Sequence, residues 1–303
     1  MSKNLEYFYY PPVNPQFFFP RSKFKRYRGF YTPYSIESKF FWFLFRNSNY
    51  LRLFFKVNQN KIPLPVATIK RMTGLEESEP FFNLGTKGIE QKATIVVNDG
   101  NNKRFLKFAE RALSRKLVIN EAEVLLGLEK QSVIKTAKVI SFVNDPNFIC
   151  LTTELIVGEK FKLTKLNNKV FGLLSVLPSI YPNKDNGTIE VFSHGDFCPW
   201  NILIDKQQDI VLIDWEMSGY KPLGYDLFTY IFQTNFLLHP KKEVNDIVSE
   251  NKTYIDKYFE RYKVNYREYL IQFASLKVKD EENKANSKLL EKYKLLLQLH
   301  DLQ

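Results

Sequence analysis

The pattern of apolar and polar positions divides the chain into regions with different periods. Between residues 81 and 153, short apolar runs alternate with polar turns, which is typical of strands. The clearest turn, Asn98-Asp99-Gly100-Asn101, separates the apolar segment 93–97 from the segment 103–109, which we interpret as the return strand of a β-hairpin. Residues 117–130 instead repeat apolar side chains every three or four positions, which indicates a helix. This region is therefore predicted to be a small mixed lobe.

Helical spacing dominates the later part of the chain. We expect helices at residues 163–177 and from Tyr254 onward. Between them lies one β-hairpin, in which the apolar runs 202–204 and 210–213 flank the polar turn 205–208. The sequence thus predicts an α+β protein with a β-rich N-terminal lobe and a larger, mainly helical C-terminal lobe.

Residues 1–75 follow neither pattern. The prolines of residues 1–35 and the lack of a clear period predict irregular structure there. The aromatic-rich segment 38–55 is predicted to be helical, and residues 66–73 fit either a strand or a short helix. A polar break at 76–80 is the expected boundary. We therefore expect three parts: a basic, aromatic N-terminal extension (1–75), an N-lobe (76–157) and a C-lobe (158–303).

The net charge of the chain is concentrated in these first 75 residues. They hold 13 Lys/Arg and 2 Asp/Glu, whereas the other 228 residues carry 31 of each sign. They also hold 20 of the 47 aromatic residues. Basic and aromatic side chains interleaved in this way suit contact with an anionic membrane or glycan. One alternative is an extension packed on the neighbouring lobe with its cations solvated; a nucleic acid partner is disfavoured.

Composition sets further limits. A chain of 303 residues that is 44% hydrophobic and 25% charged is ordinary for a globular protein of one or two domains. Two cysteines, Cys150 and Cys198, are too few for a disulfide framework and fit a reducing compartment. The sequence has neither a run of about 18 apolar residues nor a leader pattern. We expect a cytoplasmic protein that can contact the inner membrane face peripherally.

Two short segments concentrate the side chains that can carry chemistry. One is His194-Gly195-Asp196-Phe197-Cys198-Pro199-Trp200-Asn201, and the other, Ile213-Asp214-Trp215-Glu216, follows the hairpin. The hairpin brings Asn201 and Asp214 together, and their oxygen atoms suit Mg²⁺, which shares its coordination with nucleotide phosphates. A carboxylate beside them, Asp196, can accept the proton of an attacking hydroxyl. These groups suit phosphoryl transfer from ATP.

The order of these residues resembles the signature of the aminoglycoside phosphotransferase and choline kinase superfamily, whose fold is similar to that of protein kinases. The signature reads H-G-D-x-x-x-x-N, a β-hairpin, then I-D-W/F-E, and the chain matches it without a gap. Protein kinases carry an arginine in place of Gly195 and Asp-Phe-Gly in place of Asp-Trp-Glu, so the small-molecule branch is favoured. Seven family-type residues occur in order: His194, Gly195, Asp196, Asn201, Asp214, Glu216 and Asp226.

The resemblance implies a role for each of these positions. Asp196 would be the catalytic base, although a lone aspartate is more often a turn or capping residue. Asn201 and Asp214 would bind Mg²⁺. Glu216 would be either a weaker metal contact or a brace. The positions that would hold the loop together are His194 and Asp226.

The resemblance is weaker over residues 81–158, which would bind the nucleotide. Lys107 lies in an apolar strand similar to the kinase lysine strand and would contact the α- and β-phosphates while pairing with a helix glutamate. Glu121 is the favoured partner and Glu123 the alternative. A lysine that snorkels from an edge strand is the competing interpretation of Lys107.

Adenine and the phosphates would be contacted mainly by backbone. Residues 152–158 resemble the family hinge, where the backbone of Glu154 and Ile156 would bind adenine. Gly85 and Gly88 would let a loop cover the phosphates. The chain contains neither a G-x-G-x-x-G nor a Walker A sequence, so these two glycines are also consistent with ordinary turns.

The sequence therefore predicts an ATP-dependent kinase that uses Mg²⁺ and a small-molecule or sugar hydroxyl as acceptor. The alternatives are an inactive nucleotide-binding scaffold and a protein kinase. Glu243, Asp246 and Glu250 share a helix face but fit a solvated surface, so no acidic pocket for a cationic antibiotic is expected. The basic N-terminal segment favours an anionic or membrane-linked acceptor, such as a surface glycan or a lipid-linked sugar.

Overall fold

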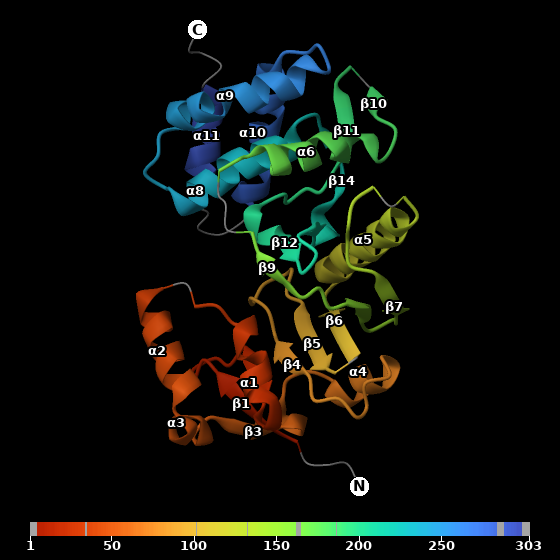
Figure 1. The fold of residues 1–303 in the computed structure, drawn as a ribbon, viewed down its shortest axis with the longest axis vertical. Coiled ribbons are helices and arrows are strands. Elements are labelled where there is room, and N and C mark those ends of the chain that lie inside the picture. The colour runs from red at the N-terminus through yellow and green to blue at the C-terminus, as the bar shows by residue number, and fades with distance from the viewer. Residues whose placement is uncertain are drawn as a thin grey trace. The chain divides into compact units, whose positions relative to one another are not determined.

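The chain forms two compact units in the computed structural model (Figure 1), which describes residues 5–33, 35–100, 102–131, 133–161, 165–185, 187–283 and 288–298. The N-terminal unit comprises Met1–Ala122 and Ala137–Ile156, and the C-terminal unit comprises Glu123–Thr136 and Val157–Gln303. One helix, α5 (Ala112–Glu129), contributes to both. The first unit is rich in strands and the second is mainly helical, so the predicted α+β fold is confirmed.

The N-terminal unit is built on one antiparallel sheet of eight strands in the order β3-β1-β2-β4-β5-β6-β8-β7 (Figure 1). Its strands are β1 (Glu6–Tyr10), β2 (Phe17–Pro20), β3 (Lys56–Asn58), β4 (Phe81–Asn83), β5 (Ala93–Asp99), β6 (Asn102–Ala109), β7 (Val139–Asn144) and β8 (Ile149–Glu154). Strand β6 lies inside the sheet, where Lys107 is opposite Thr94 of β5 and Leu151 of β8. Strands β1, β2 and β3 therefore extend the sheet that carries Lys107.

Within residues 1–35, the described residues 5–33 form two strands and three short helical segments, so the prediction of irregular structure there is wrong. Strands β1 and β2 pair with each other, and Tyr10 is opposite Phe17. The turn between them contains Pro11, Pro12 and Pro15, where proline does not interrupt the strand pairing. Aromatic side chains are buried on both faces of the two strands, so polar and apolar positions do not alternate in the sequence.

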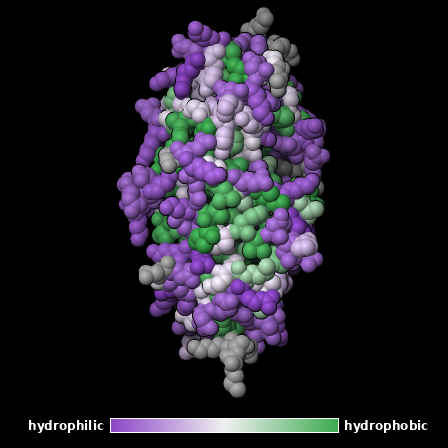
Figure 2. Space-filling model, turned by 90° about the vertical axis from the view of Figure 1, so that its right-hand side faces the viewer, coloured by the Kyte–Doolittle hydropathy of each residue, from purple (hydrophilic) through white to green (hydrophobic). Residues whose placement is uncertain are grey.

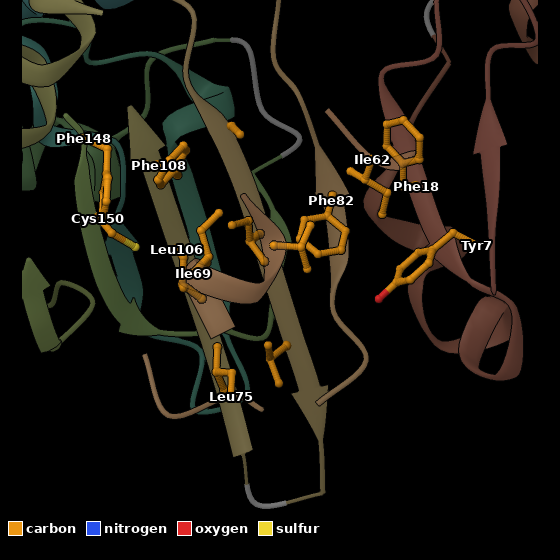
Figure 3. Close-up of a cluster of buried hydrophobic side chains, with 14 residues drawn as sticks. Tyr7, Phe18, Ile62, Ile69, Leu75, Phe82, Leu106, Phe108, Phe148 and Cys150 are labelled. Carbon is orange, nitrogen blue, oxygen red and sulfur yellow. The ribbon is translucent and has the colours of Figure 1, made fainter. Parts of the chain in front are cut away.

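Each face of this sheet packs against a hydrophobic cluster. Neighbouring residues such as Phe81 and Phe82 belong to different clusters, because successive side chains of a strand point to opposite faces. Figure 3 shows the first cluster, in which Tyr7 and Phe18 of the N-terminal segment lie alongside Phe82. Its members are Tyr7, Phe18, Ile62, Val66, Ile69, Leu75, Phe82, Ala93, Ile95, Val97, Leu106, Phe108, Phe148 and Cys150. The second contains Phe8, Tyr10, Phe19, Phe24, Tyr27, Trp42, Phe45, Phe81 and Val96.

Short helices cover the two clusters. Helix α4 (Val66–Met72) belongs to the first, so residues 66–73 form a helix and not a strand. Helices α1 (Phe24–Tyr27) and α2 (Ile36–Asn47) belong to the second, and α3 (Asn49–Leu53) follows α2. The predicted helix at 38–55 is thus two helices. The remaining short turns are the 3₁₀ segments η1 (Arg21–Lys23), η2 (Arg28–Phe30) and η3 (Gln59–Lys61).

The C-terminal unit combines two small sheets with a set of helices (Figure 1). The sheets have the orders β10-β11-β14 and β13-β12-β9. Their strands are β9 (Gly158–Lys160), β10 (Lys184–Asp185), β11 (Ile189–Ser193), β12 (Ile202–Asp205), β13 (Ile210–Leu212) and β14 (Gly219–Pro222). The α-helices are α6 (Asn168–Val176), α7 (Tyr225–Phe228), α8 (Thr234–Leu238), α9 (Val244–Glu260), α10 (Tyr266–Glu282) and α11 (Leu290–Gln298). The 3₁₀ segments are η4 (Leu177–Ser179), η5 (Pro199–Asn201) and η6 (Trp215–Met217), and η7 (Thr229–Gln233) is π-helical.

These helices agree with the sequence pattern except at their ends. The helix predicted at 163–177 begins at Asn168, and residues 162–164 lie outside the described part of the chain. Its first turn is capped by Asn167, whose side chain accepts the N–H groups of Lys169 and Val170. The predicted helical tail begins before Tyr254, with α9.

No helix within the described residues is long and apolar enough to cross a membrane. Figure 2 shows one face of the molecule, where hydrophilic side chains cover much of the surface and hydrophobic ones gather in the central part. Among the large apolar side chains that remain exposed, five lie on α2 alone: Ile36, Phe40, Phe41, Phe43 and Leu44.

Candidate active site

The chain turns sharply directly after β11, and this turn begins the candidate catalytic loop. Gly195 has a φ of +85°, a conformation that glycine adopts without steric penalty. A Cβ at this position would lie 2.0 Å from the carbonyl oxygen of Met217. The close approach of the loop to residue 217 therefore requires a glycine here.

A buried carboxylate holds the start of the loop. Asp226, in the first turn of α7, accepts the backbone N–H of His194 at 2.6 Å and that of Gly195 at 2.9 Å. Burial raises the pKa of Asp226, and its interactions with His194 and the two N–H donors act in the opposite direction. The predicted brace is confirmed, because one side chain fixes two successive peptide groups of the loop.

His194 is also structural, as predicted. Its Nε2 lies 3.0 Å from the carbonyl oxygen of Ile213, and its Nδ1 accepts the N–H of Asp196 at 3.4 Å. A carbonyl oxygen only accepts hydrogen bonds, so Nε2 is the ring nitrogen that donates to Ile213. The ring packs against Trp215 at 4.6 Å between centroids. Both ring nitrogens are engaged inside the loop, so His194 is not available as a base.

Asp196 is the one partly exposed side chain of the turn formed by residues 194–198. Its Oδ2 accepts a hydrogen bond from Nδ2 of Asn201 at 2.8 Å, and its Oδ1 accepts one from Nε2 of Gln233 at 2.8 Å. The thiol of Cys198 lies 3.6 Å from Oδ1. Burial raises the pKa of Cys198, so the sulfur stays protonated and can donate. The carboxylate is thus oriented by three side chains.

The hairpin β12–β13 brings the ends of its strands together, as the sequence predicts. Ile202 is opposite Leu212, and beyond this pair the N–H of Ile213 donates to the carbonyl oxygen of Asn201 at 3.1 Å. Nδ2 of Asn201 donates to both the backbone and the side chain of Asp196, so this amide turns its Oδ1 away from Asp196. Asp214 follows with φ 68° and ψ 59°, a left-handed conformation that is rare outside glycine.

Such a conformation at a residue other than glycine is often found at functional sites, because surrounding structure must stabilise it. Asp214 directly precedes η6, whose Trp215 anchors the turn by donating from Nε1 to the carbonyl oxygen of Leu212 at 3.2 Å. Asn201 and Asp214 therefore offer an amide oxygen and a carboxylate at neighbouring ends of one hairpin.

In the N-terminal unit, Lys107 pairs with Glu121. Nζ of Lys107 lies 2.5 Å from Oε2 of Glu121, and both side chains are buried. Glu123, the alternative partner, is exposed. Lys107 lies on an interior strand of the sheet, so the edge-strand interpretation does not apply. A buried ion pair is costly to desolvate and contributes little to stability on average, which favours a functional reason for its presence.

The two glycines of the proposed phosphate loop differ. Gly85 has φ +71°, and a Cβ there would lie 2.2 Å from the carbonyl oxygen of Lys92. Gly88 has no such requirement, because a Cβ would meet no atom within 4 Å. The turn after β4 therefore needs glycine at residue 85 only.

At the predicted hinge, Glu154 is the last residue of β8. Its N–H donates to the carbonyl oxygen of Lys138 at 2.9 Å and is therefore already engaged by the sheet. The next N–H, that of Leu155, donates to the carbonyl oxygen of Lys103 at 3.1 Å. Ile156 lies beyond the end of the strand.

The sequence analysis missed three residues that support Asp196. Oε1 of Gln233 accepts a hydrogen bond from Nζ of Lys277 at 3.0 Å and from the hydroxyl of Tyr293 at 3.3 Å, which turns its Nε2 towards Asp196. Burial raises the pKa of Tyr293, so its hydroxyl remains a donor. Gln233 ends the π-helical segment η7, and such segments are frequent at functional sites. We call Gln233, Lys277 and Tyr293 the supporting triad.

A weak signal for the triad was present in the sequence. Gln233 directly follows the mainly apolar and aromatic run 227–232, and Lys277 lies on α10 one turn after the buried Phe273. A polar side chain on a buried helix face needs a partner. The partners lie up to 60 residues apart, however, and helical spacing cannot pair them.

The segment that contains the candidate loop matches a known protein family. A model of the phosphotransferase enzyme family matches residues 187–269, the segment that contains Asp196, Asn201 and Asp214. Among solved structures, the choline kinase LicA from Streptococcus pneumoniae is similar with 14% identity and a TM-score of 0.55, over 78% of this chain and 99% of that chain. The resemblance inferred from the sequence is therefore confirmed. The fold is protein-kinase-like, and the family match supports phosphotransferase chemistry.

A second similar structure is the aminoglycoside phosphotransferase APH(3'')-Id from Streptomyces rimosus in complex with ADP and streptomycin. It is 14% identical with a TM-score of 0.46, over 66% of this chain and 91% of that chain. A search of curated proteins found no match to this sequence.

Proposed function

We propose that the protein is an ATP-dependent phosphotransferase that transfers the γ-phosphate to a hydroxyl group of a small-molecule or sugar acceptor. The observation that carries the proposal is the carboxylate of Asp196, which is partly exposed and held by Asn201 and Gln233 inside the segment that matches the phosphotransferase family. A base for this reaction must be oriented towards the acceptor hydroxyl, and a carboxylate fixed on both oxygens meets that need.

In this mechanism Asp196 accepts the proton of the acceptor hydroxyl as the oxygen attacks phosphorus. An ionised carboxylate offers about four acceptor positions. Donors from Asn201, Gln233 and Cys198 use up to three of them. The remaining position is the one that the substrate hydroxyl would occupy. Gln233 is a positioning residue here, and Lys277 acts through it by fixing the orientation of the amide.

The residues suited to hold Mg²⁺ are Asn201, through its Oδ1, and Asp214. The fit rests on the donor set: the Asn201 amide already directs its nitrogen to Asp196, so its oxygen is the atom left for a cation. Hard oxygen donors are those that Mg²⁺ selects. When bound, the ion would neutralise negative charge on the phosphates.

For the nucleotide, we propose that Lys107, held by Glu121, contacts the α- and β-phosphates, and that Gly85 and Gly88 belong to the loop that covers them. The backbone at Glu154 and Ile156 would bind adenine. The buried pair at 2.5 Å supports the first role, because an ammonium group fixed inside the sheet is preorganised for an anionic ligand. In this proposal residues 76–157 form the nucleotide-binding lobe and residues 158–303 bind the acceptor.

The proposed acceptor is a sugar hydroxyl, including one on a surface glycan or a lipid-linked sugar. The buried charges near Asp196 have both signs, because Lys277 and Glu281 lie one turn apart on α10, so they do not select the charge of the acceptor. The basic N-terminal segment is the feature that favours an anionic or membrane-linked acceptor. Peripheral contact of residues 1–75 with an anionic membrane or glycan would bring such acceptors close.

Turnover with MgATP and a panel of hydroxyl acceptors, followed by ADP release, tests the proposal. Replacing Asp196 by Asn should lower kcat by about 10²–10⁴-fold, because general base catalysis is lost, while nucleotide binding is retained. The matched control is Asp209→Asn, at an exposed aspartate of the hairpin turn, which should leave kcat unchanged.

Three outcomes would contradict this assignment. Nucleotide binding without turnover on any acceptor would favour an inactive scaffold. Transfer to protein substrates alone would favour a protein kinase. Unchanged kcat in Asp196→Asn would reject Asp196 as the base.

A further inference from the structure

Helix α2 has two faces of very different character. Trp42 and Phe45 point inward and belong to the second hydrophobic cluster of the N-terminal unit. Five large apolar side chains are instead 39–86% exposed: Ile36, Phe40, Phe41, Phe43 and Leu44. We call these five residues the α2 outer face. The surface of a globular protein rarely exposes so many aromatic and aliphatic side chains on one helix, and such patches mark interaction sites.

The geometry of an α-helix places the α2 outer face on one continuous arc. At about 100° per residue, the five side chains span roughly 160° of the helix circumference. Glu37 and Asn47 lie within this arc. Lys39 and Arg46 lie together at one border, between the outer face and the buried face. The arrangement is that of an amphipathic interfacial helix, with an apolar face bordered by cations.

This surface is held rigidly by the rest of the unit. Ser35 caps the start of α2 by accepting the N–H of Ser38 at 3.0 Å. At the other end, the buried guanidinium group of Arg52 donates to the carbonyl oxygens of Phe45 at 2.8 Å and Arg46 at 2.7 Å. Helix termini leave such carbonyl groups without intrahelical partners. The apolar side chains are therefore presented by a helix fixed at both ends, which Figure 1 shows at the outer edge of the unit.

The segment that contains α2 is basic, and α2 itself carries Lys39 and Arg46 against one acidic residue, Glu37. Residues 1–75 have a net charge of +11. Some of these cations are neutralised, since Arg21 pairs with Glu6 and Lys23 with Asp99. Among the described residues, however, Lys39 and Arg46 are exposed and form no ion pair. An anionic partner would therefore find unneutralised cations directly beside the apolar arc.

We propose that the α2 outer face docks on the surface of an anionic lipid bilayer. Phe40 and Phe43 enter the boundary between head groups and acyl chains, and Lys39 and Arg46 remain among the anionic head groups. Helix α2 has 12 residues and is about 18 Å long, so it lies along the surface and does not cross the membrane. The docking itself does not require catalysis. Its purpose, access to a membrane-linked hydroxyl acceptor, rests on the proposed function.

Charge distinguishes this partner from two others. A second copy of the chain would oppose one strongly basic segment with another, which like-charge repulsion disfavours. A nucleic acid requires cations spread over the contact surface, whereas the centre of this arc is apolar. A bilayer places anionic head groups beside an apolar interior, and α2 likewise places Lys39 and Arg46 beside its apolar outer face.

Co-sedimentation of the full-length protein with vesicles tests the proposal. We expect binding to phosphatidylcholine vesicles that contain phosphatidylserine, and weaker binding without phosphatidylserine or at high salt. Replacing Phe40 and Phe43 together by Ser should lower the partition coefficient by at least about tenfold. Lys39→Gln with Arg46→Gln should lower it by about tenfold with phosphatidylserine present and have little effect without it.

Matched controls use exposed residues elsewhere. Val13→Ser with Leu238→Ser removes two exposed apolar side chains, and Lys206→Gln with Lys241→Gln removes two exposed cations; neither pair should alter vesicle binding. Circular dichroism and thermal unfolding check that each variant is folded. Asp196→Asn should bind vesicles like the unchanged protein, which separates docking from the failure of the proposed catalytic function.

Three results would overturn the inference. One is failure of the unchanged protein to sediment with any vesicle. Another is vesicle binding that persists when Phe40 and Phe43 are replaced. The third is a concentration-dependent dimer in light scattering, or binding to a single-stranded oligonucleotide, that the same replacements abolish while vesicle binding remains.

Discussion

The catalytic loop with its hairpin and the N-terminal segment are stabilised in contrasting ways. In the loop, directional hydrogen bonds converge on a few atoms, as when one carboxylate, Asp226, holds two successive N–H groups. In the N-terminal segment, aromatic side chains pack on both faces of a sheet mainly through ring contacts, and those of the α2 outer face remain exposed. The atoms of a hydrogen-bonded network can be arranged in few ways that satisfy every donor and acceptor. The contribution of an aromatic side chain to stability depends instead on whether it lies on a buried or an exposed face.

The largest change in stability is expected at the buried face of α2, whereas the same kind of substitution on its outer face should have little effect. Trp42→Ala removes a buried ring from the second hydrophobic cluster and should lower the free energy of unfolding by about 3–5 kcal/mol. Phe43→Ala, on the outer face one residue away, should change it by less than about 0.5 kcal/mol. Urea denaturation measures both values. Equal losses would show that the outer face is covered in solution.

In the catalytic loop, one methyl group should be enough to disturb the structure. Gly195→Ala would force a left-handed conformation and a contact with the carbonyl oxygen of Met217, so we expect a loss of about 2–3 kcal/mol. The control is Gly172→Ala in α6, where a Cβ meets no atom within 4 Å and helix propensity favours alanine. Thermal unfolding compares them. A neutral Gly195→Ala variant would mean that the loop is less constrained than its hydrogen bonds indicate.

The supporting triad should show its role in kcat more than in nucleotide affinity. Gln233→Leu removes the donor to Oδ1 of Asp196, and the base then loses its fixed orientation. We expect kcat to fall by about 10–100-fold with little change in the KM for ATP. Gln207→Leu, at an exposed glutamine of the hairpin turn, is the control. A change confined to the KM for ATP would argue against positioning of the base.

The smallest effect is expected at the two thiols. Burial raises the pKa of Cys150 to about 12, and burial also raises that of Cys198. A raised pKa means less thiolate at a given pH, so at pH 8 only about 10⁻⁴ of Cys150 would be ionised. Ellman's reagent should therefore label neither thiol in the folded protein at pH 8 and both after unfolding in urea. Rapid labelling of Cys198 in the folded state would indicate that the loop opens.

Sequence reasoning succeeded best where the spacing between residues is short. The hairpin between Asn201 and Asp214 followed from two apolar runs and a polar turn, because strand pairing across a short turn is a local property. The brace by Asp226 followed from a family pattern in which His194 and Asp226 are only 32 positions apart. Strands β1 and β2 were missed for a local reason as well, since a strand that is aromatic on both faces has no alternating pattern.

The sequence by itself determined the two-lobed α+β fold, the identity of the loop around Asp196 and the excess of positive charge in the first 75 residues. Only the tertiary structure decided that those residues continue the N-terminal sheet, that Lys107 pairs with the favoured Glu121 and not with Glu123, and that Gln233 orients Asp196. The physical reason is the distance along the chain over which each kind of signal acts. Periodicity and turn chemistry act between neighbours, whereas a buried polar group finds its partner wherever the packed chain places one.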